Sequence, residues 1–386
     1  MLGFSTFAAL LPELRDLWRL SNSQAGIISG TFFAGYIGTV SLWTALTDRF
    51  DARRIYLAGS LLATAGSAGF GLLAEGFASA VAFQALLGIG IAATYMPGLR
   101  LLSDRVSGPL QSRTIAFYTS FFGIGTALSL AIAGLIAPAH GWRAAFSLSA
   151  GGPLIAGLLV LYRLEAVPRP ATPGRGFALG TLFPVGAWRR VMSDRAAAGY
   201  TLGYAAHCLE LFGSRAWMVA FLAFSSGMHA GESFPWNLAA VAAVVNLLAV
   251  PASIVGNEVA LRVGRRRWIL MVMAASGASG MVLALGAPWH WAIVLGMLSA
   301  YSMLVMAESG TLTAGLVAAA PAELRGAAMG LYSLAGFCGG MLGPVVFGAA
   351  LDASGGAQSL AAWVAAYAAI GSGCLAAPVV ARLFRR

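Results

Sequence analysis

The chain has 386 residues, of which 59% are hydrophobic and only 10% are charged, whereas a soluble domain carries about 25% charged residues. A soluble fold of this length cannot bury so much apolar surface, so the composition excludes an ordinary soluble protein and indicates lipid as the main solvent. The net charge of +10 comes from 24 basic residues, all of them arginine. Nearly all of these fall in short gaps between apolar runs, which argues against nucleic-acid binding.

Eleven segments are long and apolar enough to cross a bilayer, which requires about 20 residues in a helix. They are Gln24–Leu46, Ile55–Ala74, Ser79–Leu102, Thr114–Ala137, Ala144–Leu161, Ala197–Phe224, Trp236–Ala260, Trp268–Gly286, Trp291–Ala318, Gly326–Leu351 and Leu360–Val380. The preceding run, Met1–Leu11, is apolar but about half the required length, and it has no basic leader typical of a cleaved signal peptide. We expect it to be the second half of a truncated first helix, which gives twelve spans in the intact protein.

The distribution of arginine predicts the orientation of these spans. When the partial helix is counted as the first, the even-to-odd connections and the C-terminal tail hold 19 of the 24 arginines. The opposite connections hold only Arg15, Arg19 and Arg143. By the positive-inside rule, both ends of the chain lie in the cytoplasm. The sequence therefore predicts a multi-pass protein of the inner, cytoplasmic membrane.

One long polar interval, rich in arginine and proline, divides the chain into two halves of similar helix content. We expect an N-terminal six-helix bundle at 1–162, a cytoplasmic central loop at 163–195 and a C-terminal six-helix bundle at 196–386. Arg113 before the fifth span is matched by Arg325, 212 positions later, before the eleventh. Such a repeat predicts a duplicated six-helix unit, as in one class of transporters.

The connection between the second and third spans reads TDRFDARR, and its counterpart between the eighth and ninth reads ALRVGRRR. Three arginine pairs in the two loops share a separation of 213 positions: Arg49 with Arg262, Arg53 with Arg266, and Arg54 with Arg267. The first loop resembles the G-x-x-x-D-R-x-G-x-R-R pattern of the major facilitator superfamily, with Asp48 as the acid and with Thr44 and Asp51 where glycines are expected. The second loop keeps Gly264, but Leu261 replaces the acid.

The resemblance covers the whole length and implies an all-α integral membrane fold of two six-helix bundles. It also implies that the loop residues act as a cytoplasmic gate, in which an acid caps a helix start and arginines bind carboxylates. These gate residues are Asp48, Arg49, Arg53, Arg54, Arg262, Arg266 and Arg267. The alternative is that the arginines only fix the orientation of the spans.

Other motifs of the family are absent or altered. Gln84 stands in the fourth span where proton-coupled members often have arginine, and the fifth span lacks the Gly-Pro motif of drug-efflux antiporters. The eleventh span carries glycine pairs at four-residue spacing, Gly336 with Gly340 and Gly339 with Gly343. Such spacing predicts close helix packing in lipid rather than substrate contact.

Ionisable groups inside spans indicate the substrate pathway, because an ionised side chain at bilayer depth costs about 2.5 kcal/mol or more. His207, Glu210 and Arg215 lie in the seventh span with Tyr204, on neighbouring faces of one helix. Glu308 lies near the centre of the tenth span, and Tyr95 of the fourth span corresponds to it in the repeat. The resemblance places spans 1, 4, 7 and 10 around the cavity, so we expect these six residues to line the pathway of substrate and protons. The competing interpretation is structural: Arg215 neutralises Glu210 or Glu308 and locks two helices together.

The sequence predicts a secondary active transporter, a permease for a small polar or anionic solute, which works by alternating access. Because burial disfavours a charged carboxylate, Glu308 or Glu210 would carry the proton of a symport mechanism. One alternative is efflux of an amphipathic compound or drug by proton antiport. Another is a transporter-like sensor or partner subunit that moves nothing.

We expect no enzymatic activity, no cofactor and no metal, since no motif for them is present. Cys208, Cys338 and Cys374 lie far apart in apolar runs and are expected to be small buried hydrophobic residues. The expected partners are a small-molecule substrate, protons and the lipid bilayer, and the expected state is a monomer.

Overall fold

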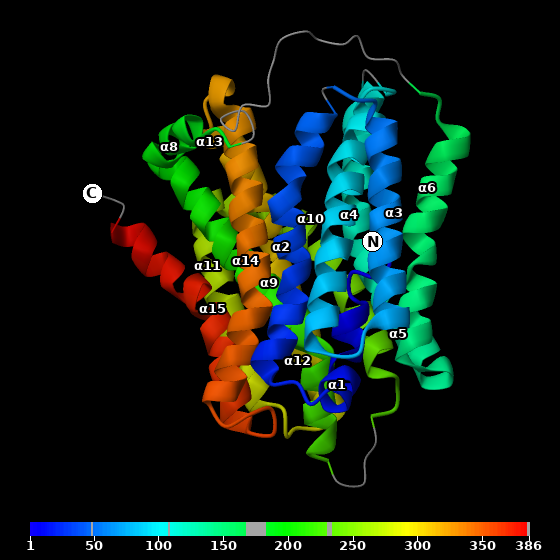
Figure 1. Cartoon of the computed structure of the whole chain (residues 1–386). Helices are drawn as coiled ribbons and strands as arrows, with labels where there is room; N and C mark the ends of the chain where they lie inside the picture. The colour runs from blue at the N-terminus through cyan, green and yellow to red at the C-terminus, as the bar shows by residue number, and fades with distance from the viewer. Residues whose placement is uncertain (48, 107–108, 167–182, 230–233, 384–386) are drawn as a thin grey trace. The chain divides into compact units, whose positions relative to one another are not determined.

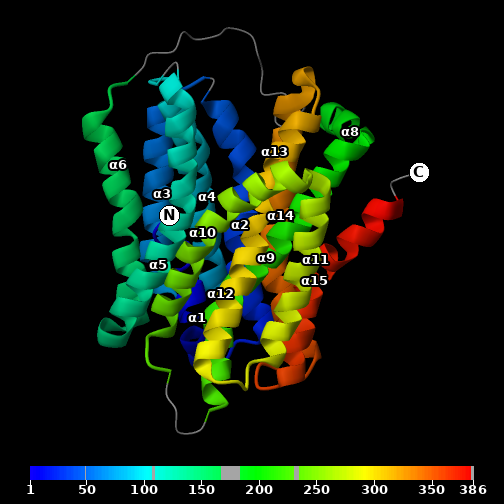
Figure 2. The same cartoon turned by 180° about the vertical axis from the view of Figure 1, so that it is seen from behind.

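The computed structural model describes residues 1–47, 49–106, 109–166, 183–229 and 234–383. Every regular element among these residues is helical, as the hydropathy pattern predicts. The backbone hydrogen bonds of a helix are satisfied within the segment itself, which is why this element suits a chain with so little polar surface. Figure 1 shows the helices in chain order, and Figure 2 shows them from behind.

Ten helical segments of the described chain are long and apolar enough to span a membrane. The number is one lower than the eleven predicted spans, because the fifth and sixth predicted spans form one helical segment, Phe121–Arg163. Gly141 interrupts it with a positive φ of 79°, a backbone conformation that glycine adopts without steric cost. The chain therefore reverses at this glycine, between the predicted fifth and sixth spans.

The chain divides into two compact units. Unit 1 comprises Met1–Leu10 and Thr31–Pro184, and unit 2 comprises Leu11–Gly30 and Val185–Arg386. Two helices are shared between the units, namely α1 (Thr6–Leu17) and α2 (Asn22–Leu46). The amino-terminal part of α2 thus packs with the second unit although it belongs to the first half of the sequence.

Unit 1 contains four further helices: α3 (Ala52–Leu73), α4 (Phe77–Ser103), α5 (Pro109–Ser149) and α6 (Gly151–Arg163). Helices α3 and α4 run side by side (Figure 1). A Cβ atom on Gly66 would lie 2.6 Å from the backbone nitrogen of Leu87, and one on Gly90 would collide with the backbone of Ala63. Small residues thus bring the two backbones together where lipid provides no hydrophobic driving force.

The core of unit 1 combines stacked aromatic rings with a buried hydroxyl cluster. The rings of Phe70 and Phe146 stack with centroids 3.9 Å apart. The Thr6 hydroxyl lies 3.2 Å from the hydroxyls of both Ser129 and Ser149, so α1 is tied to α5 at two points. Each hydroxyl of this cluster therefore has a protein partner, which compensates for its burial away from water.

Unit 2 is built around α9, whose carboxyl-terminal half is almost entirely buried. Its helices are α8 (Val185–Ser193), α9 (Arg195–Gly227), α10 (Leu238–Val263), α11 (Arg265–Leu285), α12 (Trp291–Ala307), α13 (Ser309–Ala319), α14 (Arg325–Ala353) and α15 (Leu360–Leu383). A short 3₁₀ turn, η1 (Ala322–Leu324), precedes α14.

Helices α9 and α14 approach each other through the predicted glycine face of the eleventh span. A Cβ atom on Gly339 would collide with the carbonyl oxygen of Ala205, and one on Gly343 would collide with that of Leu209. The two backbones are therefore in direct contact over at least one turn. The spacing of these glycines serves helix packing, as the sequence predicts.

The predicted tenth span, Trp291–Ala318, is not one helix. The regular helical hydrogen-bond pattern is interrupted at Glu308, so that α12 ends and α13 begins at this residue, although its φ and ψ of −96° and −18° stay in the right-handed helical region. The sequence contains no proline at this position, and hydropathy alone does not predict the break. This interruption between α12 and α13 lies at an ionisable residue and is therefore a candidate functional feature.

Replacement of Gly343 by leucine is expected to separate α14 from α9 and to lower the free energy of unfolding by about 1–3 kcal/mol or more, since overpacking forces backbone shifts. The measurement is thermal unfolding in detergent. Gly330→Leu is the matched control, because a Cβ atom at Gly330 on the same helix meets nothing within 4 Å. Equal melting temperatures for the two variants would contradict the packing described for this face.

Candidate functional site

The centre of unit 2 holds a buried acid–base pair. His207 Nδ1 of α9 lies 3.0 Å from Glu308 Oε1, at the break between α12 and α13. Both residues are 0% exposed. The second polar atom of each side chain, His207 Nε2 and Glu308 Oε2, is also buried and has no hydrogen-bond partner among the described residues. Two groups that each retain an open polar atom in the interior are well suited to accept a proton or a ligand group.

The backbone around the break is held by side chains from two neighbouring helices. Trp268 Nε1 of α11 donates a hydrogen bond to the carbonyl oxygen of Ala307 at 3.1 Å. The backbone nitrogen of Gly310 donates to Ser253 Oγ of α10, also at 3.1 Å. These bonds satisfy a carbonyl and an amide that the interrupted helix leaves open. Trp268 and Ser253 therefore fix the position of Glu308.

An aromatic column lies beside the pair. The rings of Tyr204 and Tyr332 stack with centroids 3.8 Å apart, and the Tyr204 ring lies nearly parallel to that of His207 at 5.7 Å. The Tyr332 hydroxyl lies 2.9 Å from the Thr313 hydroxyl of α13. The column thus links α9, α14 and α13 around the buried pair. It restricts the orientation of the imidazole.

Glu210 lies one turn after His207 but faces other helices. Ser276 Oγ of α11 donates a hydrogen bond to Glu210 Oε2 at 2.9 Å, and the buried Cys374 of α15 lies beside the same carboxyl group. Glu210 is 1% exposed. Helical periodicity groups Glu210 with His207 around one cavity, whereas the structure directs Glu210 toward α11 and α15 and His207 toward Glu308.

The two other predicted pathway residues are Arg215 and Tyr95. Arg215 is partly exposed, and no ion pair between it and Glu210 or Glu308 occurs in the described part of the chain. The partner of Glu308 is His207, so the predicted locking of two helices by Arg215 is not observed. Tyr95 belongs to unit 1, where its carbonyl oxygen accepts a 2.9 Å hydrogen bond from Tyr118 Oη.

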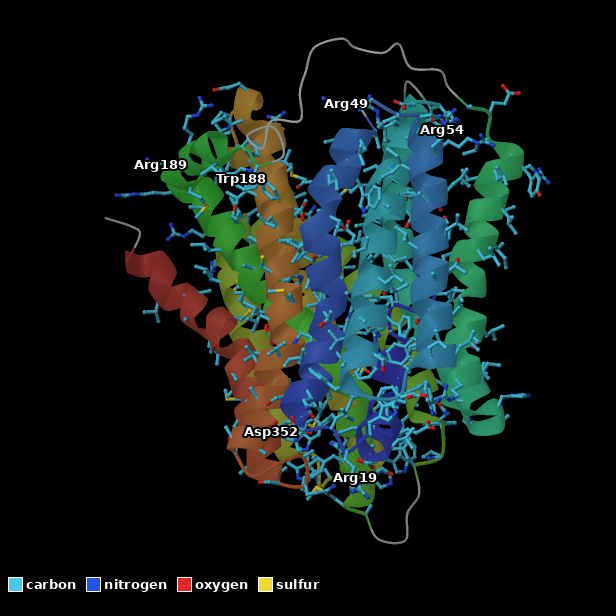
Figure 3. All side chains as sticks on the ribbon, viewed as in Figure 1. Arg19, Arg49, Arg54, Trp188, Arg189 and Asp352 are labelled. Atoms are coloured by element: carbon cyan, nitrogen blue, oxygen red, sulfur yellow. The ribbon has the colours of Figure 1, made fainter. Side chains whose placement is uncertain are left out.

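Of the first predicted gate, Arg49 and Arg54 lie at one end of unit 1 in Figure 3. Asp48 lies outside the described residues. Asp51, which replaces a family glycine, accepts a hydrogen bond from the backbone nitrogen of Arg53 and caps the start of α3. The Arg53 side chain donates to the carbonyl oxygen of Leu161 at 2.6 Å, so it ties α3 to the end of α6.

The second predicted gate is the turn between α10 and α11. Gly264 ends one helix and begins the next with a φ of 92°, in the left-handed region that favours glycine. Arg262, Arg266 and Arg267 are exposed around this turn. The retained glycine therefore has a backbone role.

Sequence reasoning missed the residues that support the ionisable groups. Ser276, Cys374, Trp268 and Ser253 are ordinary spanning residues by composition. Their role depends on which helices are neighbours, which the order of spans does not specify. Tyr332 and Thr313 were missed for the same reason.

Residues 1–344 match the family model described as Major Facilitator Superfamily. The chain belongs to this superfamily. Among curated relatives, protein spinster homolog 3 of Danio rerio is 24% identical over 222 residues, which cover 56% of this chain and 44% of that protein. The niacin transporter NiaP of Acinetobacter baylyi is 26% identical over 172 residues, which cover 44% and 38%, respectively. The chain thus spans less than half the length of these superfamily relatives.

Solved structures of the superfamily share the fold. The bacterial homolog of the human lysosomal transporter spinster, in an inward-facing and unoccupied conformation, matches with a TM-score of 0.75 at 16% identity, over 99% of this chain and 92% of that one. The nucleoside transporter NupG matches with a TM-score of 0.74 at 12% identity, over 100% of this chain and 98% of that one. At these identities the likeness establishes the fold alone. The expected integral membrane fold of the major facilitator superfamily is confirmed.

Replacement of Ser276 by alanine is expected to lower the free energy of unfolding by about 1–3 kcal/mol, because the buried Glu210 carboxyl group loses a hydrogen bond. Thermal unfolding in detergent is the measurement. Ser279→Ala in the same helix is the control, since the Ser279 hydroxyl donates to the Ser276 carbonyl oxygen of its own helix and to no carboxyl group of the described residues. In a Glu210→Met background, which removes the acceptor, the effect of Ser276→Ala should shrink. Full additivity of the two changes would show that the contact contributes nothing.

Proposed function

We propose that the chain is a secondary active transporter that carries a small polar or anionic solute across the cytoplasmic membrane by alternating access, together with protons. The observation that carries this proposal is the buried His207–Glu308 pair at the break in the tenth span. Ionisable residues within spans of membrane proteins mark substrate paths and proton relays. The superfamily membership of the chain supports transport as the activity.

The pair is suited to hold one exchangeable proton. In its resting form it shares a single proton, either as neutral glutamic acid and imidazole or as carboxylate and imidazolium, with no net charge in both cases. Addition of a second proton leaves a net positive charge, which is costly away from water. The pair therefore binds the extra proton only when water or a compensating charge reaches it.

An anionic solute supplies such a compensating charge. When the solute lies beside the doubly protonated pair, the two charges cancel, so each stabilises the binding of the other. The unpartnered atoms His207 Nε2 and Glu308 Oε2 provide the donors for this contact once the extra proton is bound. Binding of the solute and of the proton is then cooperative, which favours uptake in the same direction rather than exchange.

The names of two relatives agree with this substrate class. One is the niacin transporter NiaP of Acinetobacter baylyi. The other is the probable 4-methylmuconolactone transporter of Cupriavidus pinatubonensis, which is 30% identical over 168 residues and is covered to 36% of its length. Small cyclic or carboxylate solutes are therefore the first candidates.

In this mechanism the basic loops lie on the cytoplasmic side of the membrane. Arg49 and Arg54 of the first loop, and Arg262, Arg266 and Arg267 of the second, are exposed and suited to bind carboxylates or headgroups as the gate closes. Arg53 instead supports the fold of unit 1. Both chain termini are cytoplasmic in this orientation, and a monomer is the working unit.

Glu308→Gln is expected to abolish solute uptake driven by a pH gradient in proteoliposomes, because an amide cannot take up the proton. The measurement is internal acidification, followed with a pH-sensitive dye on addition of nicotinate, muconolactone or uridine to vesicles with an acidic exterior. For the solute that produces a signal with the parent protein, the variant should fall to the level of protein-free vesicles.

Glu258→Gln is the matched control, because Glu258 is an exposed carboxylate of α10. It should retain the parent rate. Uptake by a folded Glu308→Gln protein at the parent rate would remove Glu308 from the mechanism. Uptake that no longer depends on the pH gradient would instead assign Glu308 to coupling alone.

Cysteines that replace Arg54 and Arg266 are expected to react with a membrane-impermeant maleimide from the same, cytoplasmic, side. The physical reason is the positive-inside rule applied to the two related loops. Labelling of right-side-out and inside-out vesicles measures the side. Reaction from opposite sides would contradict the duplicated arrangement on which the transport proposal depends.

A further inference from the structure

The start of α2 is bound to the end of α14 by one carboxylate. Asp352 Oδ1 accepts hydrogen bonds from the backbone nitrogen and the side-chain amide of Asn22, at 3.1 and 2.7 Å. Asp352 Oδ2 accepts from the backbone nitrogen and the hydroxyl of Ser23, at 2.8 and 2.6 Å. A carboxylate at a helix amino terminus with four donors forms charge-assisted hydrogen bonds, the stronger kind in proteins.

Next to this contact, the backbones of α2 and α14 touch at a row of glycines. A Cβ atom on Gly26 would collide with the carbonyl oxygen of Pro344, and one on Gly30 with that of Met341. From the other side, a Cβ atom on Gly348 would collide with the carbonyl oxygen of Asn22. We call this contact, formed by residues 22–30 and 341–352, the α2–α14 seam.

The seam lies entirely within unit 2, yet it involves a helix that both units share. Residues Leu11–Gly30 belong to unit 2, and the rest of α2, from Thr31, belongs to unit 1. Since α2 is one continuous helix, the units cannot move relative to each other unless the seam parts or α2 bends. Two helix surfaces made of glycine carry no interlocked side chains, so the helices can separate without side-chain rearrangement.

The start of α2 does not need Asp352 to remain helical. The Ser21 hydroxyl accepts a hydrogen bond from the backbone nitrogen of Gln24 at 3.1 Å, and the Gln24 side chain accepts from the Ser21 backbone nitrogen at 3.0 Å. This reciprocal arrangement is a capping box, which stabilises the first turn by itself. On release, water can replace Asp352 at the two amides, because Asp352 is exposed.

The seam also has a defined position along unit 2. Figure 3 shows Asp352 and Arg19 at one end of this unit and the α8 residues Trp188 and Arg189 at the other. In the orientation predicted from arginine, α8 is cytoplasmic and Asp352 lies on the external side. The contact is therefore on the side opposite to the basic loop between α10 and α11.

We propose that Asp352 is a latch that closes the external end of the α2–α14 seam, and that its release from Asn22 and Ser23 is the step that opens the transporter to the outside. This inference rests on the proposed transport function. In this proposal, the Asp352 carboxylate stabilises the closed state of the external side. When the latch opens, the amino-terminal part of α2 leaves α14 and moves with unit 1.

The test uses a cysteine placed in the seam segment of the full chain in proteoliposomes, with Cys338 replaced by serine to remove the half-buried native thiol. Ala25 of α2 is 0% exposed, so Ala25→Cys should react slowly with an impermeant maleimide while the seam is closed. Added Asp352→Ala should raise the labelling rate from the outside about tenfold, because four charge-assisted hydrogen bonds are lost. Asp352→Asn, which keeps an acceptor, should give a smaller increase.

A second variant opens the seam without a change in charge. Gly26→Leu should raise the labelling rate as Asp352→Ala does, because the side chain wedges α2 away from Pro344. Gly38→Leu is the matched control on the same helix, since a Cβ atom at Gly38 meets nothing within 4 Å. Asp104→Ala is the control for charge, because Asp104 pairs with Arg100 at 3.0 Å in unit 1. Both controls should label at the parent rate.

The parent rate in both Asp352→Ala and Gly26→Leu would overturn the proposal. An equal increase in the two controls would also overturn it, because the change would then be general loosening of the fold. If Asp352→Ala fails to fold, Asp352→Asn and Gly26→Leu decide the matter. The readout needs neither solute nor proton gradient, so it is independent of the outcome for Glu308→Gln.

Discussion

A backbone amide or carbonyl at membrane depth must find its partner within the protein, and this constraint shapes unit 2 more than any other. The break at Glu308 is the place where the constraint is hardest to meet, because an interrupted helix leaves donors and acceptors open. The indole of Trp268 and the hydroxyl of Ser253, which lie on two separate helices, form hydrogen bonds with these open backbone groups. The two hydrogen bonds thus stabilise the irregular backbone, which places the Glu308 carboxyl group beside His207. Without this support, the cost of open backbone groups would restore a continuous helix and move Glu308 away from His207.

Glu210 interacts electrostatically with Glu308 and His207, but the two carboxyl groups have different hydrogen-bond partners. Glu210 is satisfied by Ser276 beside Cys374, whereas Glu308 and His207 satisfy each other only in part. The hydrogen bond from Ser276 holds the Glu210 carboxyl group in place and ties α9 to α11. A partly bonded pair keeps polar atoms for a further proton or ligand group. This difference in hydrogen bonding, rather than depth or charge, is the physical reason to assign the exchangeable proton to the pair.

Much of the fold follows from composition and periodicity. Hydropathy locates nearly all spans, because each must be apolar over a whole bilayer thickness, and the glycine spacing of α14 predicts its close contact with α9. The candidate site is less accessible to such reasoning. His207 and Glu210 are three residues apart, about 60° around a helix, and that angle is enough for them to face different neighbours. Which neighbours these are depends on tertiary packing, and so does the pairing of Asp352 with Asn22, which is 330 positions distant. The break at Glu308 carries no proline or glycine signal at the residue itself.

The two features of unit 2 fit one physical scheme. Transport by alternating access requires that the closed state be stable yet separable, and that its stability depend on what occupies the centre. In the proposed mechanism, the α2–α14 seam closes the external side. The two helices can separate there because the seam consists of glycine surfaces and one exposed carboxylate. In the proposed mechanism, the His207–Glu308 pair provides this dependence, since a second proton gives the pair a net charge that is stable only beside water or an anion. Helix α14 contacts both α9, which carries His207, and the start of α2 through glycines of one helix. In the proposed mechanism, these two small groups of polar residues would couple proton binding to opening.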